Sequence, residues 1–251
     1  MARTVPLIAA ALSALLLWSA YPPMGETCAI VFALAPLLAV SRLCAPKKAG
    51  WTWFGGGFLF WFATLAWMPA VSKNNGPLPL VVLGWAGLAA VCAGYFALFG
   101  WLSARAWRRL SAPRRPASPI RKLLLLLFAE PVLWAGIEWV RSWLFTGFAW
   151  NFLGTALGQI PSLAAPARLG GVYLVSALVV LLNGVFATLA CRFWVQMRPQ
   201  RTGGADGRPL EVWRLAFGNR WGRMCETALP LGLILLAFGL SNLSLMSFFC
   251  L

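Results

Sequence analysis

The sequence predicts an all-α integral membrane protein: a bundle of about seven transmembrane helices, with a cytoplasmic N-terminus and a periplasmic C-terminus. Of the 251 residues, 61% are hydrophobic and 11% are charged, whereas soluble domains carry about 25% charged residues. Seven apolar stretches come near the roughly 20 residues that a spanning helix needs. The basic residues fall almost entirely on one side of these stretches, as expected for a protein with a fixed orientation in a membrane.

The first expected helix is Val5–Tyr21, which ends at Pro22 and Pro23 because proline cannot continue a helix. Arg3 before this apolar run also fits a cleaved signal peptide. No clear cleavage site follows, and the later chain stays apolar, so we expect a retained helix. The second expected helix, Thr27–Val40, is short and contains a proline.

The third and fourth expected helices are Trp51–Val71 and Leu78–Ser103. Both contain small residues at positions where neighbouring helices can approach closely. We interpret these glycines as packing residues rather than sites; they are Gly55, Gly56, Gly57, Gly84, Gly87, Gly94 and Gly100.

The last three expected helices are Leu123–Leu144, Gly171–Cys191 and Ala228–Phe248. Residues 142–170 are too apolar for an ordinary loop, yet glycines and prolines interrupt them repeatedly. Irregular backbone at membrane depth must be covered by protein or line a wet cavity. We therefore expect this stretch to lie along the outer interface or re-enter the membrane, and to shape a cavity there.

The distribution of basic residues predicts the orientation. With the N-terminus in the cytoplasm, 18 of the 21 basic residues lie inside, and Lys73, Arg141 and Arg168 lie outside. This asymmetry follows the positive-inside rule, and seven spans then place Leu251 outside. The formal charge of +15 is thus explained by topology, and no basic surface interleaved with aromatic residues suggests nucleic acid.

Several kinds of site are excluded by composition. The chain has no histidine, which rules out a histidine triad, a HEXXH metal site and a histidine proton relay. The six cysteines, at 28, 44, 92, 191, 225 and 250, show no CxxC spacing, so we interpret them as small apolar packing residues. No metal or cofactor is expected. No internal repeat is found, so an inverted-repeat transporter gains no support.

A charged constellation lies inside the fifth apolar stretch. Glu138 and Arg141 are three residues apart, so they share a helical face and can pair. They either line a polar pocket for a lipid headgroup or form a structural ion pair, and the sequence leaves both open. For Glu130, which precedes Pro131, we expect a structural hydrogen bond or a protonated acid.

Aromatic residues crowd the end of this helix. Trp143, Phe148 and Trp150 lie close to Arg141 in the sequence. Each one singly fits an interfacial aromatic belt, and together they are candidates for contact with acyl chains. Asn151 is a polar residue in the same apolar stretch and a candidate partner for a headgroup or the backbone.

Two adjacent motifs carry a family resemblance. The run EWVRSWLFTGFAWNFLG at 138–154, followed by LGGVYLVSALVVLLNGVFATL at 169–189, resembles the membrane domain of bacterial apolipoprotein N-acyltransferase, whose pattern reads approximately E-[WF]-L-R-x-W-[LV]-x-T-G-F-P-W. Weaker, collinear matches are YPPMG at 21–25, LAPLLAVSR at 34–42 and GFLFWFATLAWM at 57–68. The chain departs from the pattern at Ala149, where the family usually has proline, and around Thr155–Gln159.

The resemblance implies a function in lipoprotein biosynthesis at the bacterial inner membrane. The family transfers an acyl chain from a phospholipid to the N-terminal cysteine of an apolipoprotein, and a nitrilase-like domain with a Glu-Lys-Cys triad performs the chemistry. Residues 1–251 are expected to form a single transmembrane domain without that domain. Cys250 lacks the base and cation that a nucleophilic cysteine needs, so no catalytic residue is expected.

Three functions follow as alternatives. The chain is a membrane module of the acyltransferase, not catalytic by itself, that works with a separate nitrilase-like chain and binds phospholipid and apolipoprotein. Alternatively it is a non-catalytic, truncated relative or a lipid-binding scaffold. The third alternative is a small transporter that uses Glu130 or Glu138, which the absence of repeats disfavours.

Overall fold

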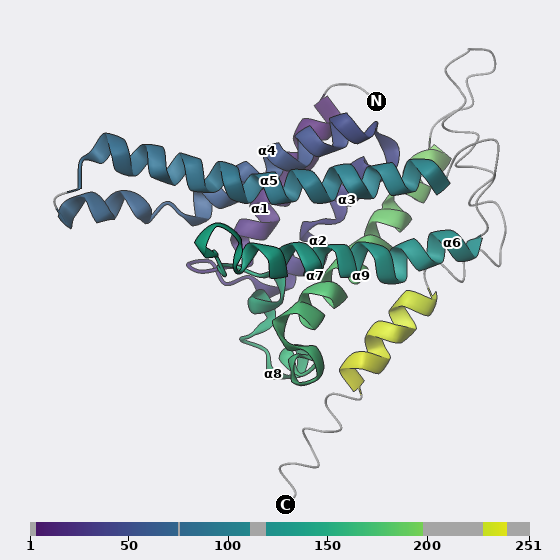
Figure 1. Ribbon diagram of the computed structural model, residues 1–251. Helices are drawn as coiled ribbons and strands as arrows, with labels where there is room; N and C mark the ends of the chain where they lie inside the picture. Colours follow the sequence, from purple (N-terminus) through teal and green to yellow (C-terminus); the bar gives the residue numbers. More distant parts are fainter. Residues whose placement is uncertain (1–3, 75, 111–118, 198–227, 240–251) are drawn as a thin grey trace, which may run out of the picture. The chain divides into compact units, whose positions relative to one another are not determined.

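The computed structural model shows a helical chain (Figure 1). Within the part that it describes, helices and turns account for the secondary structure and no strand is found, so the all-α class is confirmed there. The chain divides into two compact units, residues 1–104 and 105–251. The described residues are 4–74, 76–110, 119–197 and 228–239.

In the first unit, α1 (Thr4–Ser19) packs along α4 (Pro46–Thr64). Alanine and leucine, the residues with high helix propensity, dominate α1. Helix α4 starts earlier than expected because Pro46 has a φ that suits the first helical turn. The two backbones approach closely at Gly56, where a Cβ would lie 3.2 Å from the carbonyl oxygen of Ala10.

The expected second helix is broken. Pro36 has no N–H to donate to the carbonyl of Phe32, so the helix before it cannot continue. A new helix starts with Pro36 in its first turn. The three resulting segments are η1 (Thr27–Ala29), α2 (Ile30–Ala33) and α3 (Ala35–Leu43).

The core of the first unit centres on Trp53, which is fully buried. Its indole Nε1 donates hydrogen bonds to the Leu37 carbonyl, at 3.1 Å, and to Ser41 Oγ, at 2.8 Å. Its ring packs against α5 (Leu78–Leu110) at Gly100, where a Cβ would overlap the indole. The tryptophan is therefore fixed by hydrogen bonds on one side and by helix contact on the other.

The packing role expected for the glycines is confirmed at Gly56, Gly57 and Gly100, where a Cβ would crowd a neighbouring helix. It is not supported at four others, where an added Cβ would have no described atom within 4 Å: Gly55, Gly84, Gly87 and Gly94. The expected third helix also ends early, because α4 stops at Thr64 and the following residues form η2 (Met68–Asn74). Helix α5 continues past the expected Ser103 to Leu110.

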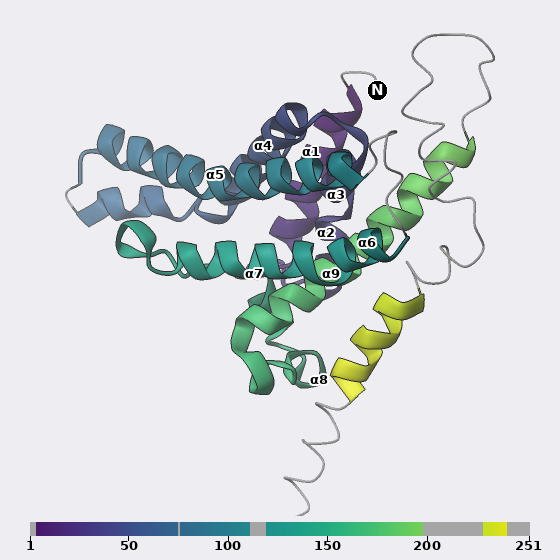
Figure 2. The ribbon, with the colours of Figure 1, turned by 45° about the vertical axis from the view of Figure 1, so that its right-hand side comes forward.

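In the second unit, the expected fifth helix is one nearly continuous run with a wide turn inside it (Figure 2). It consists of α6 (Pro119–Leu124), the π-helical η3 (Leu125–Ala129) and α7 (Glu130–Arg141). Pro131 lies two residues after the end of the wide turn and cannot donate to the carbonyl of Leu127. Single π-helical turns occur inside α-helices, and this one lies beside the proline.

Helix α9 (Ala167–Met197) packs against α7. Gly170 and Gly171 interrupt its helical geometry, so the regular helix starts where the sequence predicts. The helix 228–239 joins the core through Ile234, which packs with Leu126 of η3 and with α9. The rest of the expected seventh helix lies outside the described residues.

Two described helices are long and apolar enough to cross a membrane: Leu78–Leu110 and Ala167–Trp194. Three polar side chains inside the helices bond to their own backbone. Thr52, Asn183 and Thr188 each donate to the carbonyl four residues earlier. Of the described cysteines, Cys44, Cys92 and Cys191 are buried as expected, whereas Cys28 is exposed.

We predict that Gly100→Ala destabilises the first unit, because the new methyl group overlaps the hydrogen-bonded Trp53 indole. Overpacking of this kind costs about 1–3 kcal/mol, which exceeds the helix-propensity gain of about 1 kcal/mol. Thermal unfolding of the detergent-solubilised chain measures the effect. The matched control is Gly94→Ala in the same helix, where the midpoint should stay or rise; equal midpoints for the two variants would contradict this packing.

Candidate functional site

One face of α7 carries a row of buried polar and aromatic side chains. Glu130, Trp134, Glu138 and Arg141 follow one another at intervals of four, four and three residues, so they lie on the same side of the helix. Their exposed fractions are 1%, 4%, 3% and 5%. Charges this deeply buried need partners nearby, and the contacts of each show what the row does.

Glu130 has a structural hydrogen bond, as one of the two expectations for it stated. Its Oε1 accepts a hydrogen bond of 2.8 Å from the indole Nε1 of Trp107, which lies near the C-terminal end of α5. Both side chains are buried. This bond ties the start of α7 to the end of α5 within the second unit.

Glu138 caps a helical turn that belongs to another part of the chain. Its Oε1 accepts a 2.8 Å hydrogen bond from the backbone N–H of Leu153 and a 2.9 Å bond from the indole of Trp134. Leu153 is the first residue of η5 (Leu153–Leu157), whose own N-cap residue makes no side-chain capping bond. The carboxylate of α7 thus satisfies an N–H group that the turn leaves without an internal partner.

Ser176 of α9 completes this cap. Its hydroxyl accepts a 2.8 Å hydrogen bond from the N–H of Gly154, and its side chain lies beside the Glu138 carboxyl. At Gly154 a Cβ would lie only 2.6 Å from the carbonyl oxygen of Val172, so η5 sits directly against α9. Two consecutive backbone amides are therefore held by side chains from two different helices.

Arg141 satisfies carbonyl groups in the same loop. Its guanidinium donates to the carbonyl oxygens of Phe148, at 2.7 Å, and Trp150, at 2.8 Å. It also lies over the ring of Phe152, 4.9 Å from the centroid. In return, the N–H of Phe148 donates to the carbonyl of Arg141 at 2.8 Å, so the loop is fastened to the end of α7 on both sides.

The expected pairing of Glu138 with Arg141 therefore has a particular form. The two side chains attract each other electrostatically. Apart from the Trp134 indole, however, their hydrogen-bond partners described above are backbone groups of residues 148–153. The carboxylate accepts from an amide while the guanidinium donates to carbonyls. Glu138 Oε2 is buried and has no hydrogen-bond partner among the described residues.

The loop that these side chains hold is backbone-strained. Phe145, Thr146 and Asn151 have φ values of 52°, 73° and 45°, in the left-handed region that costs non-glycine residues about 1–3 kcal/mol each. Gly147 has a φ of 80°, and a Cβ at this position would overlap the carbonyl of Ser142, so the turn needs glycine here. Such a conformation persists only when surrounding contacts determine it, and the bonds to Glu138, Arg141 and Ser176 do so.

Aromatic side chains project from this fixed loop and the adjoining helix end. The exposed fractions are 53% for Trp143, 48% for Trp150 and 80% for Phe145. Phe148 stacks on Trp150 at 6.3 Å, and Trp143 meets Trp139 edge to face at 5.4 Å. The candidate contact residues therefore form two aromatic pairs, and Asn151 lies in the left-handed turn beside them.

Four members of the site were not predicted from the sequence. Trp134 could have been found, because it lies four residues before Glu138 on the same face. Ser176 and the amides of Leu153 and Gly154 gave no signal, because they reach Glu138 only when α9 and the loop fold against α7. The site is thus larger than the motif around Glu138.

The chain is similar to one family of known proteins. Residues 13–185 match the family model described as the apolipoprotein N-acyltransferase N-terminal domain. Proteins named apolipoprotein N-acyltransferase are similar to the chain: that of Rhodopirellula baltica is 30% identical over 79% of this chain and 33% of its own length. Those of Geobacter metallireducens and Pseudomonas putida are 33% and 35% identical, over 70% and 76% of this chain and 32% and 36% of their own. The chain thus spans about a third of the length of these relatives.

We predict that Glu138→Ala destabilises the second unit far more than Glu138→Gln. Alanine leaves the Leu153 amide and the Trp134 indole without an acceptor in a buried place, at a cost of about 1–3 kcal/mol for each group. Glutamine keeps a carbonyl oxygen for both donors. Thermal unfolding in detergent distinguishes the two, and similar midpoints for both variants would show that the cap is not stabilising.

We predict that Arg141→Ala releases the loop. The variant removes the donor to two carbonyls, so amide hydrogen exchange should become faster at residues 145–153, while exchange in α1 stays unchanged. Arg168→Ala, which removes an exposed arginine at the start of α9, is the matched control and should leave exchange as it is. Unaltered exchange in the Arg141 variant would contradict a bracing role.

Proposed function

Because this chain belongs to the family of apolipoprotein N-acyltransferase N-terminal domains, we propose that it is the membrane module of an enzyme that acylates lipoproteins. In this proposal it holds the phospholipid that donates the acyl chain and the apolipoprotein whose N-terminal cysteine accepts it. The chemistry is assigned to a nitrilase-like domain beyond these 251 residues, on the same polypeptide or on a separate partner chain. The module is therefore not catalytic by itself.

The observation that carries the proposal is the bracing of the loop by α7. Glu138 and Arg141 fix an irregular, strained segment inside an apolar stretch. Irregular backbone at membrane depth is tolerated where protein buries it or where it lines a cavity. A segment built at such conformational cost fits a place where a substrate is received better than it fits a plain connection between helices.

The proposed site divides its residues by role. Glu138 and Arg141 are positioning residues, since their hydrogen bonds run to the loop backbone. The proposed contacts for acyl chains are Trp143 and Trp150, which are large and exposed, and Phe148, which is partly exposed and stacks on Trp150. Asn151 is the proposed polar contact for a headgroup, since it lies in the same turn.

We propose that the module resides in the bacterial inner membrane as a single transmembrane domain of seven spans. The lengths and composition of α5 and α9 support membrane insertion. The excess of basic residues on one side supports a cytoplasmic N-terminus. In this orientation the loop at the end of α7 faces the periplasm, the side on which lipoproteins would be acylated.

Two alternatives are less well supported. A lipid-binding scaffold without a catalytic partner would use the same aromatic contacts, so only an activity measurement separates it from the proposal. A proton-coupled transporter needs carboxyl groups that can exchange protons with a pathway. Glu130 and Glu138 instead accept hydrogen bonds from tryptophan indoles, and Glu138 also from a backbone amide.

We predict that this chain can replace the matching N-terminal part of the Pseudomonas putida relative, to which residues of this chain are 35% identical. The fusion is produced in cells depleted of their own N-acyltransferase, and the N-terminal lipopeptide of a reporter lipoprotein is weighed by mass spectrometry. The mass of one added acyl chain is the expected result. The variant Arg141→Ala should lower the acylated fraction at least tenfold, because a loosened loop misplaces the substrate.

Arg168→Ala serves as the control in this fusion and should keep full acylation. A fusion that is present in the membrane at normal level but yields no acylated lipoprotein would refute the proposed role. Acylation by the 251-residue chain alone would show that the chemistry is not confined to a nitrilase-like part.

A further inference from the structure

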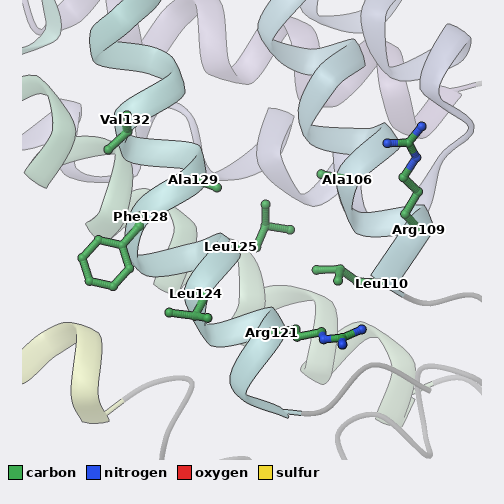
Figure 3. Close-up of a pocket in the computed structure, with 9 residues that line it drawn as sticks. All are labelled: Ala106, Arg109, Leu110, Arg121, Leu124, Leu125, Phe128, Ala129 and Val132. Atoms are coloured by element: carbon green, nitrogen blue, oxygen red, sulfur yellow. The ribbon is translucent and has the colours of Figure 1, made fainter. Parts of the chain in front are cut away.

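A groove of about 710 Å³ lies in the second unit (Figure 3). It is separate from the loop of residues 145–153 that Glu138 and Arg141 hold, which we call the braced loop. Its walls come from the C-terminal end of α5 and from the run formed by α6, η3 and the start of α7. Its volume falls within the range of about 300–1,000 Å³ that is usual for small-molecule sites. The proposed function does not use it.

Along the wall formed by α6, η3 and α7, the lining side chains change from charged at one end to apolar over the rest. One stripe begins with a charge and continues with apolar side chains only: Arg121, Leu124, Leu125, Phe128, Ala129 and Val132. The opposite wall is shorter and consists of Ala106, Arg109 and Leu110. Both arginines therefore lie at the end where α5 stops and α6 starts, as Figure 3 shows.

The length of the stripe matches one leaflet of a bilayer. From Arg121 to Val132 a helix rises about 16 Å, which is roughly half of the ~30 Å hydrocarbon core. Phe128 and Leu124 are 56% and 49% exposed, so large apolar surface faces outward along this distance. A molecule that fits has a polar end next to the arginines and an apolar part about one leaflet long.

The sequence around the polar end is rich in basic residues. Seven basic residues lie between Arg105 and Lys122, and no acidic residue occurs between Glu26 and Glu130. A basic pocket between transmembrane helices on the cytoplasmic side is a typical site for an anionic lipid headgroup. The positive-inside distribution places this end of the helices in the cytoplasm.

We propose that this groove binds one anionic glycerophospholipid of the cytoplasmic leaflet. Arg109 and Arg121 hold its phosphate group, and an acyl chain lies along Leu124, Phe128 and Val132. The site is separate from the braced loop, which lies at the other end of α7. The inference rests on the membrane orientation proposed above and not on the acyl-transfer activity.

The chemistry of the walls selects this occupant over others. A free phosphate ion would use the arginines but leave the apolar stripe uncovered. An uncharged or zwitterionic lipid would cover the stripe but brings no net negative charge to the basic end. The anionic lipid matches both ends of the groove at once.

The test measures lipid binding to the purified full chain by native mass spectrometry. Phosphatidylglycerol and phosphatidylcholine with identical acyl chains are compared, and the expected result is at least tenfold tighter binding of phosphatidylglycerol. The double variant Arg109→Gln/Arg121→Gln should lose most of this preference. Arg105→Gln/Arg108→Gln removes two exposed arginines of the same helix end that do not line the groove, and it should keep the preference.

Two further measurements distinguish the lipid from other possible ligands of the groove and do not depend on a single variant. A phosphatidylglycerol with a photoreactive acyl chain should label the peptide that contains Phe128 in the unaltered protein, and millimolar inorganic phosphate should not prevent the labelling. Equal losses in both double variants would mean that a diffuse positive field attracts the lipid. The proposal would be overturned by such equal losses. It would also be overturned by competition from phosphate, by absent labelling near Phe128, or by equal binding of the two lipids.

Discussion

The described structure of the second unit depends on one constraint, the need to pair every backbone polar group in an apolar setting. Between α7 and α9 the chain leaves regular helix, so its amides and carbonyls lose their internal partners. Glu138 supplies an acceptor for an amide, and Arg141 supplies donors for two carbonyls. One acid and one base, a single turn apart on α7, thus replace the hydrogen bonds that a helix would have made.

This arrangement explains why the charges are buried. A buried ion pair alone is weak evidence for stability, because desolvation offsets much of the attraction. Here each of the two side chains also bonds to backbone groups, which gives both a fixed geometry. The strained backbone at Phe145–Gly147 and Asn151 is held in place, and the side chains of the nearby Trp143 and Trp150 remain exposed.

The helical run from α6 to α7 joins two features of different chemistry. Its C-terminal end holds the braced loop, and its N-terminal end lines the groove between Arg109 and Val132. The π-helical turn before Pro131 lies between them, and the bond from Trp107 to Glu130 fastens the run to α5 at that point. In the proposed orientation these features face opposite leaflets, so a single helix would contact lipid on both sides of the membrane.

The sequence by itself determined the helical class, the family and the shared helical face of Glu138 and Arg141, because apolar length, motif residues and helical spacing are local properties. The predicted bounds were wrong for the second helix, which breaks at Pro36, and for the third, which starts at Pro46 and ends at Thr64. Only the tertiary structure decided what the two charges bind. Leu153 and Ser176 are distant in sequence, and they meet Glu138 because η5 packs against α9 at Gly154, a contact that no local pattern specifies.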